Sequence, residues 1–105
     1  MGVAYVPVGR PDEIQEGKMK SADLGGRRIL VTSVDGEYFA FSSQCPHEGT
    51  DLDTGEINGK RIVCEAHNYW FELQTGECVM PRGGPALAVL PLELRDGELC
   101  VRLEW

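Results

Sequence analysis

The chain has 105 residues, of which 42% are hydrophobic, and its 17 acidic and 10 basic side chains give a formal net charge of −7. This length predicts one domain, residues 1–105, and the negative charge disfavours nucleic acid and anionic membranes as partners. The longest apolar runs, such as 29–31, fall far short of the roughly 18 residues of a membrane span, and residues 1–7 show no secretory signal, so we expect a soluble cytoplasmic protein.

The predicted elements are short β-strands separated by turns. In chain order, the segments rich in β-forming residues are 3–8, 18–24, 28–34, 37–42, 57, 60–64, 70–73, 89–95 and 98–103. The turn pairs between them are Asp35-Gly36, Asn58-Gly59, Thr75-Gly76 and Asp96-Gly97. One helical turn is indicated at 11–16, which begins with proline and has acidic residues in its first turn. The fold class is therefore all-β, a small sandwich or barrel of antiparallel strands.

The candidate metal-binding residues of the sequence are two cysteine–histidine pairs. Cys45-Pro46-His47 and Cys64-Glu65-Ala66-His67 each follow a predicted strand, and they contain both histidines of the chain. Each pair offers one thiolate and one imidazole from a loop, so two facing loops could enclose a metal centre. A tetrahedral zinc site is one reading of two cysteines and two histidines. The mixed order within each pair also suits a binuclear iron centre, with both sulfurs on one iron and both nitrogens on the other.

The residues around these pairs resemble a known family. The segment 45–52, CPHEGTDL, resembles the first motif of Rieske [2Fe–2S] proteins, and 64–71, CEAHNYWF, resembles the second. The resemblance covers most of the chain. It implies the Rieske fold, with an antiparallel β-sandwich or barrel as base and a cluster-binding subdomain, about 44–82, at one tip. It also implies one [2Fe–2S] cluster whose ligands are Cys45, His47, Cys64 and His67.

Asn68 departs from the family pattern, which usually has glycine at this position. If the backbone here needs a positive φ, asparagine is the residue that tolerates it best after glycine. The departure therefore leaves the predicted ligand set unchanged.

Four further positions bear on the type of Rieske protein. Members of the respiratory and photosynthetic cytochrome complexes have a disulfide between the two motifs, and the matching residues here are Thr50 and Ala66. Those members also have serine and tyrosine hydroxyls near the cluster sulfurs, where this chain has Tyr69 and Phe71. Fewer hydrogen bonds to the sulfurs mean a lower potential. We therefore predict a value at the low end of the Rieske range of about −150 to +300 mV.

The function implied by the resemblance is that of a ferredoxin, which carries single electrons and is not itself an enzyme. Its partners would be a ferredoxin reductase and an aromatic-ring oxygenase, either a dioxygenase or a diiron monooxygenase, docking at the tip that carries His47 and His67. One alternative is a small Rieske-like subunit of a larger reductase, such as nitrite reductase. Another, of a different class, is a structural zinc-binding interaction module.

Charge and cysteine usage add two expectations. Residues 48–77 hold seven acidic side chains against Lys60 and Arg61, which indicates either a solvated surface or a docking face for a basic partner. Cys78 and Cys100 fit no ligand pattern and are predicted to be buried or half-buried free thiols. The residues expected to shield the cluster from water are Pro46, Trp70 and Pro81.

Overall fold

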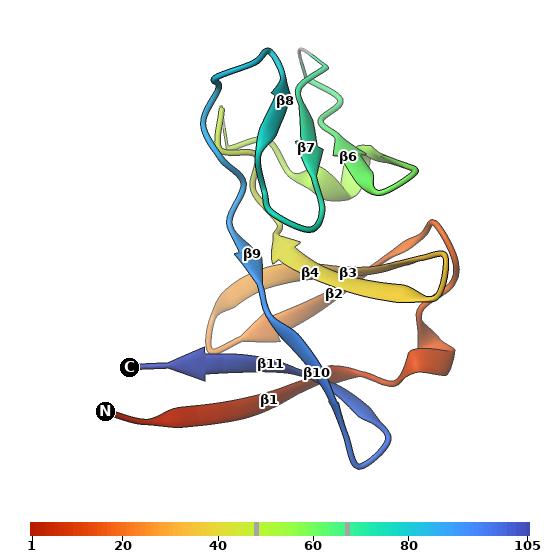
Figure 1. The fold of residues 1–105 in the computed structure, drawn as a ribbon, viewed down its shortest axis with the longest axis vertical. Coiled ribbons are helices and arrows are strands. Elements are labelled where there is room, and N and C mark those ends of the chain that lie inside the picture. Colours follow the sequence, from red (N-terminus) through yellow and green to blue (C-terminus); the bar gives the residue numbers. More distant parts are fainter. Residues whose placement is uncertain (48, 67) are drawn as a thin grey trace.

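The structure, a computed structural model, describes residues 1–47, 49–66 and 68–105. Three antiparallel sheets are stacked along its long axis (Figure 1). The outer sheet has the order β1 (Val3–Gly9), β11 (Glu98–Glu104), β10 (Leu92–Arg95), and the middle sheet β2 (Met19–Leu24), β3 (Arg27–Val34), β4 (Glu37–Ser42), β9 (Val89–Leu90). The tip sheet comprises β5 (Glu56–Asn58), β6 (Arg61–Val63), β7 (Trp70–Glu72) and β8 (Cys78–Met80). The predicted all-β class is confirmed.

Two 3₁₀ helices, η1 (Pro11–Glu13) and η2 (Leu52–Thr54), complete the elements that the structure describes. The helical turn predicted at 11–16 is thus shorter than expected, and η2 was not predicted. Among the described residues, no helix is long and apolar enough to cross a membrane.

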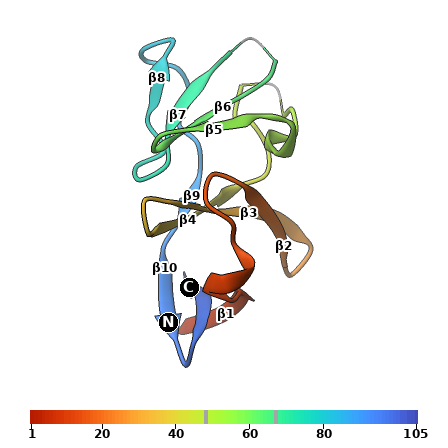
Figure 2. The same ribbon diagram turned by 90° about the vertical axis from the view of Figure 1, so that its right-hand side faces the viewer.

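The middle sheet is covered on both faces, as the side view shows (Figure 2). Side chains alternate along β3, so Ile29 and Val31 join the core cluster between the middle and outer sheets, whereas Leu30 and Val34 join the cluster between the middle and tip sheets. This explains why residues 29–31 of β3 form an uninterrupted apolar run and do not alternate with polar residues. The middle sheet is therefore the platform on which the tip is built.

Most of the predicted hairpins are present. Asp35-Gly36 joins β3 to β4 and Asp96-Gly97 joins β10 to β11, and all four residues have positive φ, as a type I′ turn requires. The Asn58-Gly59 prediction is one residue out of place, because Asn58 still pairs with Arg61 and the connection is 59–60. A hairpin at Gly25-Gly26, between β2 and β3, was missed although its two glycines are a turn signal.

The predicted strand 89–95 was wrong in one respect, because it divides at Pro91. Leu90 pairs with Ala40 in the middle sheet, and Leu92 pairs with Val101 in the outer sheet. Proline has no backbone N–H to offer to a ladder, so the strand changes sheets at this residue. The strand β8 was not predicted at all; it pairs with β7 and completes the tip sheet.

Candidate metal centre

The first cysteine loop, residues 45–50, leaves the end of β4. The backbone N–H of Cys45 donates to the carbonyl of Thr50 at 2.8 Å, and that of Gly49 donates to the carbonyl of Cys45 at 2.7 Å. Beyond the loop, the N–H of Leu52 returns to the carbonyl of Ser43 at 2.7 Å. The loop is therefore a short hairpin whose two ends are held together.

The second cysteine loop, residues 64–69, connects β6 to β7 and closes in the same way. The N–H of Cys64 donates to the carbonyl of Tyr69 at 2.8 Å, five residues on, as in the first loop. The residue before each closing carbonyl has a left-handed backbone, with φ of 73° at Gly49 and 53° at Asn68. Position 68 therefore has a positive φ, the conformation that asparagine tolerates best after glycine.

The structure brings three of the four predicted ligands to one end of the molecule. Cys45 and Cys64 are 1% and 2% exposed and belong to the same buried cluster under the tip sheet. The imidazole of His47 is half-buried and stacks on the ring of Tyr69 from the second loop, with centroids 4.1 Å apart and planes inclined by 18°. The fourth predicted ligand, His67, and the acidic residue Glu48 lie outside the described residues.

Sequence reasoning missed the ion pairs that tie the tip to the middle sheet. Arg28 on β3 pairs with Asp51 and, at 2.8 Å, with Asp53, which lie just after the first cysteine loop. Lys60, in the β5–β6 turn, pairs with Glu37 at 2.6 Å. No local signal could have found Arg28, because its partners lie 23 and 25 residues further along the chain.

These pairs reduce the acidic surface expected at 48–77. Asp51 and Asp53 are matched by Arg28, and Glu72 is matched by Arg61 at 3.0 Å. Of the acidic residues in this segment that the structure describes, those without an ion pair are Glu56, Glu65 and Glu77. Among the described residues of the two cysteine loops, Glu65 is the acidic residue without an ion pair, and it is exposed.

Asp51 gives a prediction for the pH dependence of stability. The backbone N–H of Asp53 and the guanidinium of Arg28 hold the pKa of the Asp51 carboxyl below its usual value of 3.8. A carboxyl whose pKa is lower in the folded chain stabilises the fold above its unfolded pKa, and this stabilisation is lost as the pH falls through the folded pKa. Replacing Asp51 with asparagine should therefore lower the urea midpoint above about pH 5, and the difference from the parent should vanish toward pH 2.

The control for this measurement is Glu77→Gln, because the Glu77 carboxylate has no ion-pair or hydrogen-bond partner among the residues that the structure describes. Urea midpoints followed by circular dichroism from pH 2 to 7 compare the three proteins. A difference between parent and Asp51→Asn that stays constant over this range would contradict the assignment.

The residues expected to shield the site differ in burial. Trp70 is half-buried at the start of β7, whereas Pro46 and Pro81 are exposed. Cys78 and Cys100 are both buried free thiols, as predicted. The Sγ of Cys78 lies 3.2 Å from the carbonyl oxygen of Pro81, so this thiol holds the loop that follows β8.

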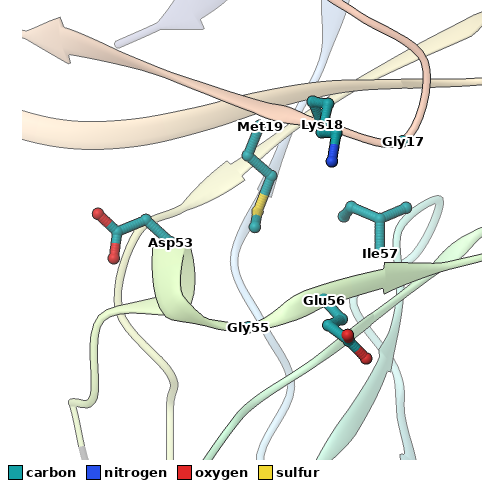
Figure 3. A pocket seen from close by; sticks show the side chains of 7 residues that line it. All are labelled: Gly17, Lys18, Met19, Asp53, Gly55, Glu56 and Ile57. Atoms are coloured by element: carbon teal, nitrogen blue, oxygen red, sulfur yellow. The ribbon is translucent and has the colours of Figure 1, made fainter.

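A groove beside the tip lies away from the cysteine loops. It has a volume of about 490 Å³ and separates the start of β2 from β5 (Figure 3). Met19 and Ile57 face each other across it, and Lys18 and Glu56 lie at its sides. None of the described predicted ligands lines this groove.

A comparison of the sequence with protein families assigns the chain to a family. The family model described as "Rieske [2Fe-2S] domain" matches residues 4–91, which is most of the chain. The chain belongs to the Rieske [2Fe–2S] family. A cluster of this kind takes two thiolates and two imidazoles, and the described part of this Rieske domain supplies the two buried thiols and one imidazole. The three described donors are therefore of the kinds that this cluster takes.

Individual relatives agree with this assignment. The Rieske domain is 26% identical over 97% of its length to the ferredoxin component of the alkene monooxygenase system of Xanthobacter autotrophicus, of which it covers 84%. The ferredoxin of carbazole 1,9a-dioxygenase from Nocardioides aromaticivorans has the same fold, with a TM-score of 0.85 and 22% identity over 93% of this chain and 96% of that one.

A second solved structure is a chain in the complex of reduced oxygenase and oxidised ferredoxin in carbazole 1,9a-dioxygenase. It gives a TM-score of 0.83 at 24% identity, over 92% of this chain and 91% of that one. The predicted Rieske fold is confirmed by both structures.

Proposed function

We propose that this Rieske protein is a one-electron carrier, the ferredoxin component of an oxygenase system. The observation that carries the proposal is the pair of cysteine loops, which close in the same way and bring two buried thiols and one imidazole to one end of a Rieske domain. The proposed ligands are Cys45, His47, Cys64 and His67, and residues 44–82 form the cluster-binding subdomain of a single domain, 1–105.

A [2Fe–2S] cluster held at these residues supplies a one-electron redox couple. The two cysteines contribute thiolates from within the core, where water has little access. Two thiolates balance the +2 charge of an oxidised cluster core, and neutral histidines add none. A bound cluster would therefore carry less negative charge here than at a site with four thiolates, which would favour its reduction. The half-buried His47 places one ligand near the surface, where an electron can leave.

The proposed partners are an oxygenase and a ferredoxin reductase, both docking at the tip that carries His47 and His67. The names of the similar proteins support the oxygenase, since one is a component of a monooxygenase system and another is a ferredoxin of a dioxygenase. The aromatic-ring substrate class and the cytoplasmic location stay predictions. We propose no substrate chemistry for this protein, which would act as an electron carrier and not as an enzyme.

Electron carriage can be tested on the purified protein. It should be red-brown, contain about two iron and two sulfide ions per chain, and give a Rieske-type EPR signal after reduction. The reduced protein should pass one electron per chain to an oxygenase component from a related system in a stopped-flow experiment. A colourless protein with one zinc ion per chain would contradict the proposal, as would a reduced protein that no oxygenase reoxidises.

Salt provides a further prediction about docking. Glu65 lies exposed in the second cysteine loop, and charges at an interface act mainly on the association rate. The rate of electron transfer to the oxygenase should fall as ionic strength rises, because salt screens the attraction between Glu65 and a basic partner. The screening length is about 8 Å at 0.15 M. Glu65→Gln should lower the rate at low salt and flatten the salt dependence.

Asp96→Asn is the matched control, since it removes the same charge from the exposed β10–β11 turn at the opposite end of the molecule (Figure 1). It should leave the rate and its salt dependence unchanged. Equal effects of the two substitutions would place the docking face elsewhere.

A further inference from the structure

His47 and Tyr69 form a direct side-chain contact between the two cysteine loops. Their rings are nearly parallel, with centroids 4.1 Å apart. Both side chains are half-buried, so the contact lies at the edge of the site and not within the core. A stacked pair of this geometry restricts rotation of either ring about its side-chain bonds.

Tyr69 is the fixed member of the pair. Its carbonyl accepts the hydrogen bond that closes the second cysteine loop, at 2.8 Å from the nitrogen of Cys64. The next residue, Trp70, begins β7 and pairs with both Val63 and Met80. The centroid of the Tyr69 ring also lies 6.4 Å from the centroid of the fully buried Phe71 ring. Its backbone and its ring are thus both attached to the tip sheet.

His47, by contrast, lies inside the first cysteine loop. The backbone bonds of that loop hold its ends, at Cys45, Gly49 and Thr50, whereas the stacking contact with Tyr69 acts on the imidazole itself. Stacking uses the faces of an aromatic ring, whereas the nitrogens of an imidazole bind metals in the plane of the ring. A stacked imidazole therefore keeps its nitrogens available to a metal while one face is covered.

We propose that Tyr69 is a positioning residue for His47: its ring sets the plane of the imidazole and covers one face of it, and its hydroxyl is not required. This inference rests on the proposed function, because it assigns the task of orienting a cluster ligand to a residue that is not itself a ligand. It also makes the aromatic pair the tie between the two loops.

The test compares Tyr69→Phe, which keeps the ring, with Tyr69→Leu, which removes it. Pulsed EPR of the reduced protein measures the nitrogen couplings of the histidine ligands. Tyr69→Phe should match the parent. Tyr69→Leu should broaden or shift one histidine coupling, that of His47, because this residue loses its stacking partner. A purely structural role would lower stability without moving one coupling selectively.

Amide hydrogen exchange of residues 45–50 is the second measurement, and it does not depend on the cluster. Exchange should be faster in Tyr69→Leu than in the parent or in Tyr69→Phe. If Tyr69→Leu fails to load the cluster, exchange in the cluster-free forms of Tyr69→Leu, Tyr69→Phe and the parent still compares chains with and without the ring.

Two results would overturn the inference: identical couplings and exchange in Tyr69→Leu and the parent, or changes in Tyr69→Phe as large as those in Tyr69→Leu. Failure of the proposed function would look different, because the parent itself would then show no Rieske signal. In that case the exchange measurement still decides whether Tyr69 ties the loops together.

Discussion

Replacing Cys64 with alanine is expected to abolish the visible absorbance and the EPR signal of the cluster completely. The thiol of Cys64 is one of two proposed sulfur ligands and is 2% exposed in the core under the tip sheet. A cluster cannot replace this ligand from water without losing the charge balance that two thiolates provide. Because metal binding and folding are coupled, the variant should also unfold at lower urea concentration than the holoprotein.

The matched control is Cys78→Ala. Cys78 is 3% exposed and belongs to the same core cluster, but it is not a proposed ligand. Its substitution by alanine removes the same thiol group as Cys64→Ala does. Its replacement should cost about 1 kcal/mol of packing together with the weak contact to Pro81, and it should keep the cluster spectrum. Iron content, absorbance and EPR measured side by side separate packing from ligation. A Cys64→Ala protein that keeps the parent spectrum would refute the ligand assignment.

Replacing Gly76 with alanine is expected to destabilise the tip strongly. Gly76 has a φ of 81°, and an added Cβ would lie 2.0 Å from the carbonyl oxygen of Leu87. The same glycine donates to the carbonyl of Glu72 and accepts from the N–H of Leu87, both at 2.8 Å, so the backbone cannot move aside without losing these bonds. The left-handed backbone and the overpacking together should cost at least about 3 kcal/mol.

Gly36 provides a control with almost the same backbone angle. Its φ is 80°, and an added Cβ would have no neighbour within 4 Å because the β3–β4 turn is open to solvent. Gly36→Ala should therefore cost only the backbone strain, about 1 kcal/mol. Urea midpoints of the two variants, followed by circular dichroism and by loss of cluster absorbance, give the difference. Equal losses would mean that the approach of Leu87 to Gly76 does not constrain the tip.

The sequence predicted the cysteine loops well because their signals are local. The spacing within Cys45-Pro46-His47 and within Cys64-Glu65-Ala66-His67 is readable without any structure, and each pair follows a predicted strand that is present. The Asp35-Gly36 and Asp96-Gly97 turns were equally readable, since aspartate and glycine tolerate the positive φ that these turns require. Their geometry in turn fixes the register of the flanking strands.

Strand assignment failed where a neighbour from elsewhere in the chain decides the structure. The predicted strand divides at Pro91 because its two halves pair with different strands, β4 and β11. The residues around Pro91 do not indicate these distant partners. The strand β8 exists because β7 offers it a free edge. Propensity alone does not settle a strand of three residues, since cross-strand packing supplies most of its stability.

The sequence by itself thus determined the all-β class, the two cysteine–histidine pairs and the turn chemistry, all of which depend on residues close together in the chain. Only the tertiary structure decided that Arg28 clamps the exit of the first loop, that Tyr69 stacks on His47 and that Leu87 closes over Gly76. The physical reason is that these contacts join segments 11 to 25 residues apart, which only the folded chain brings together.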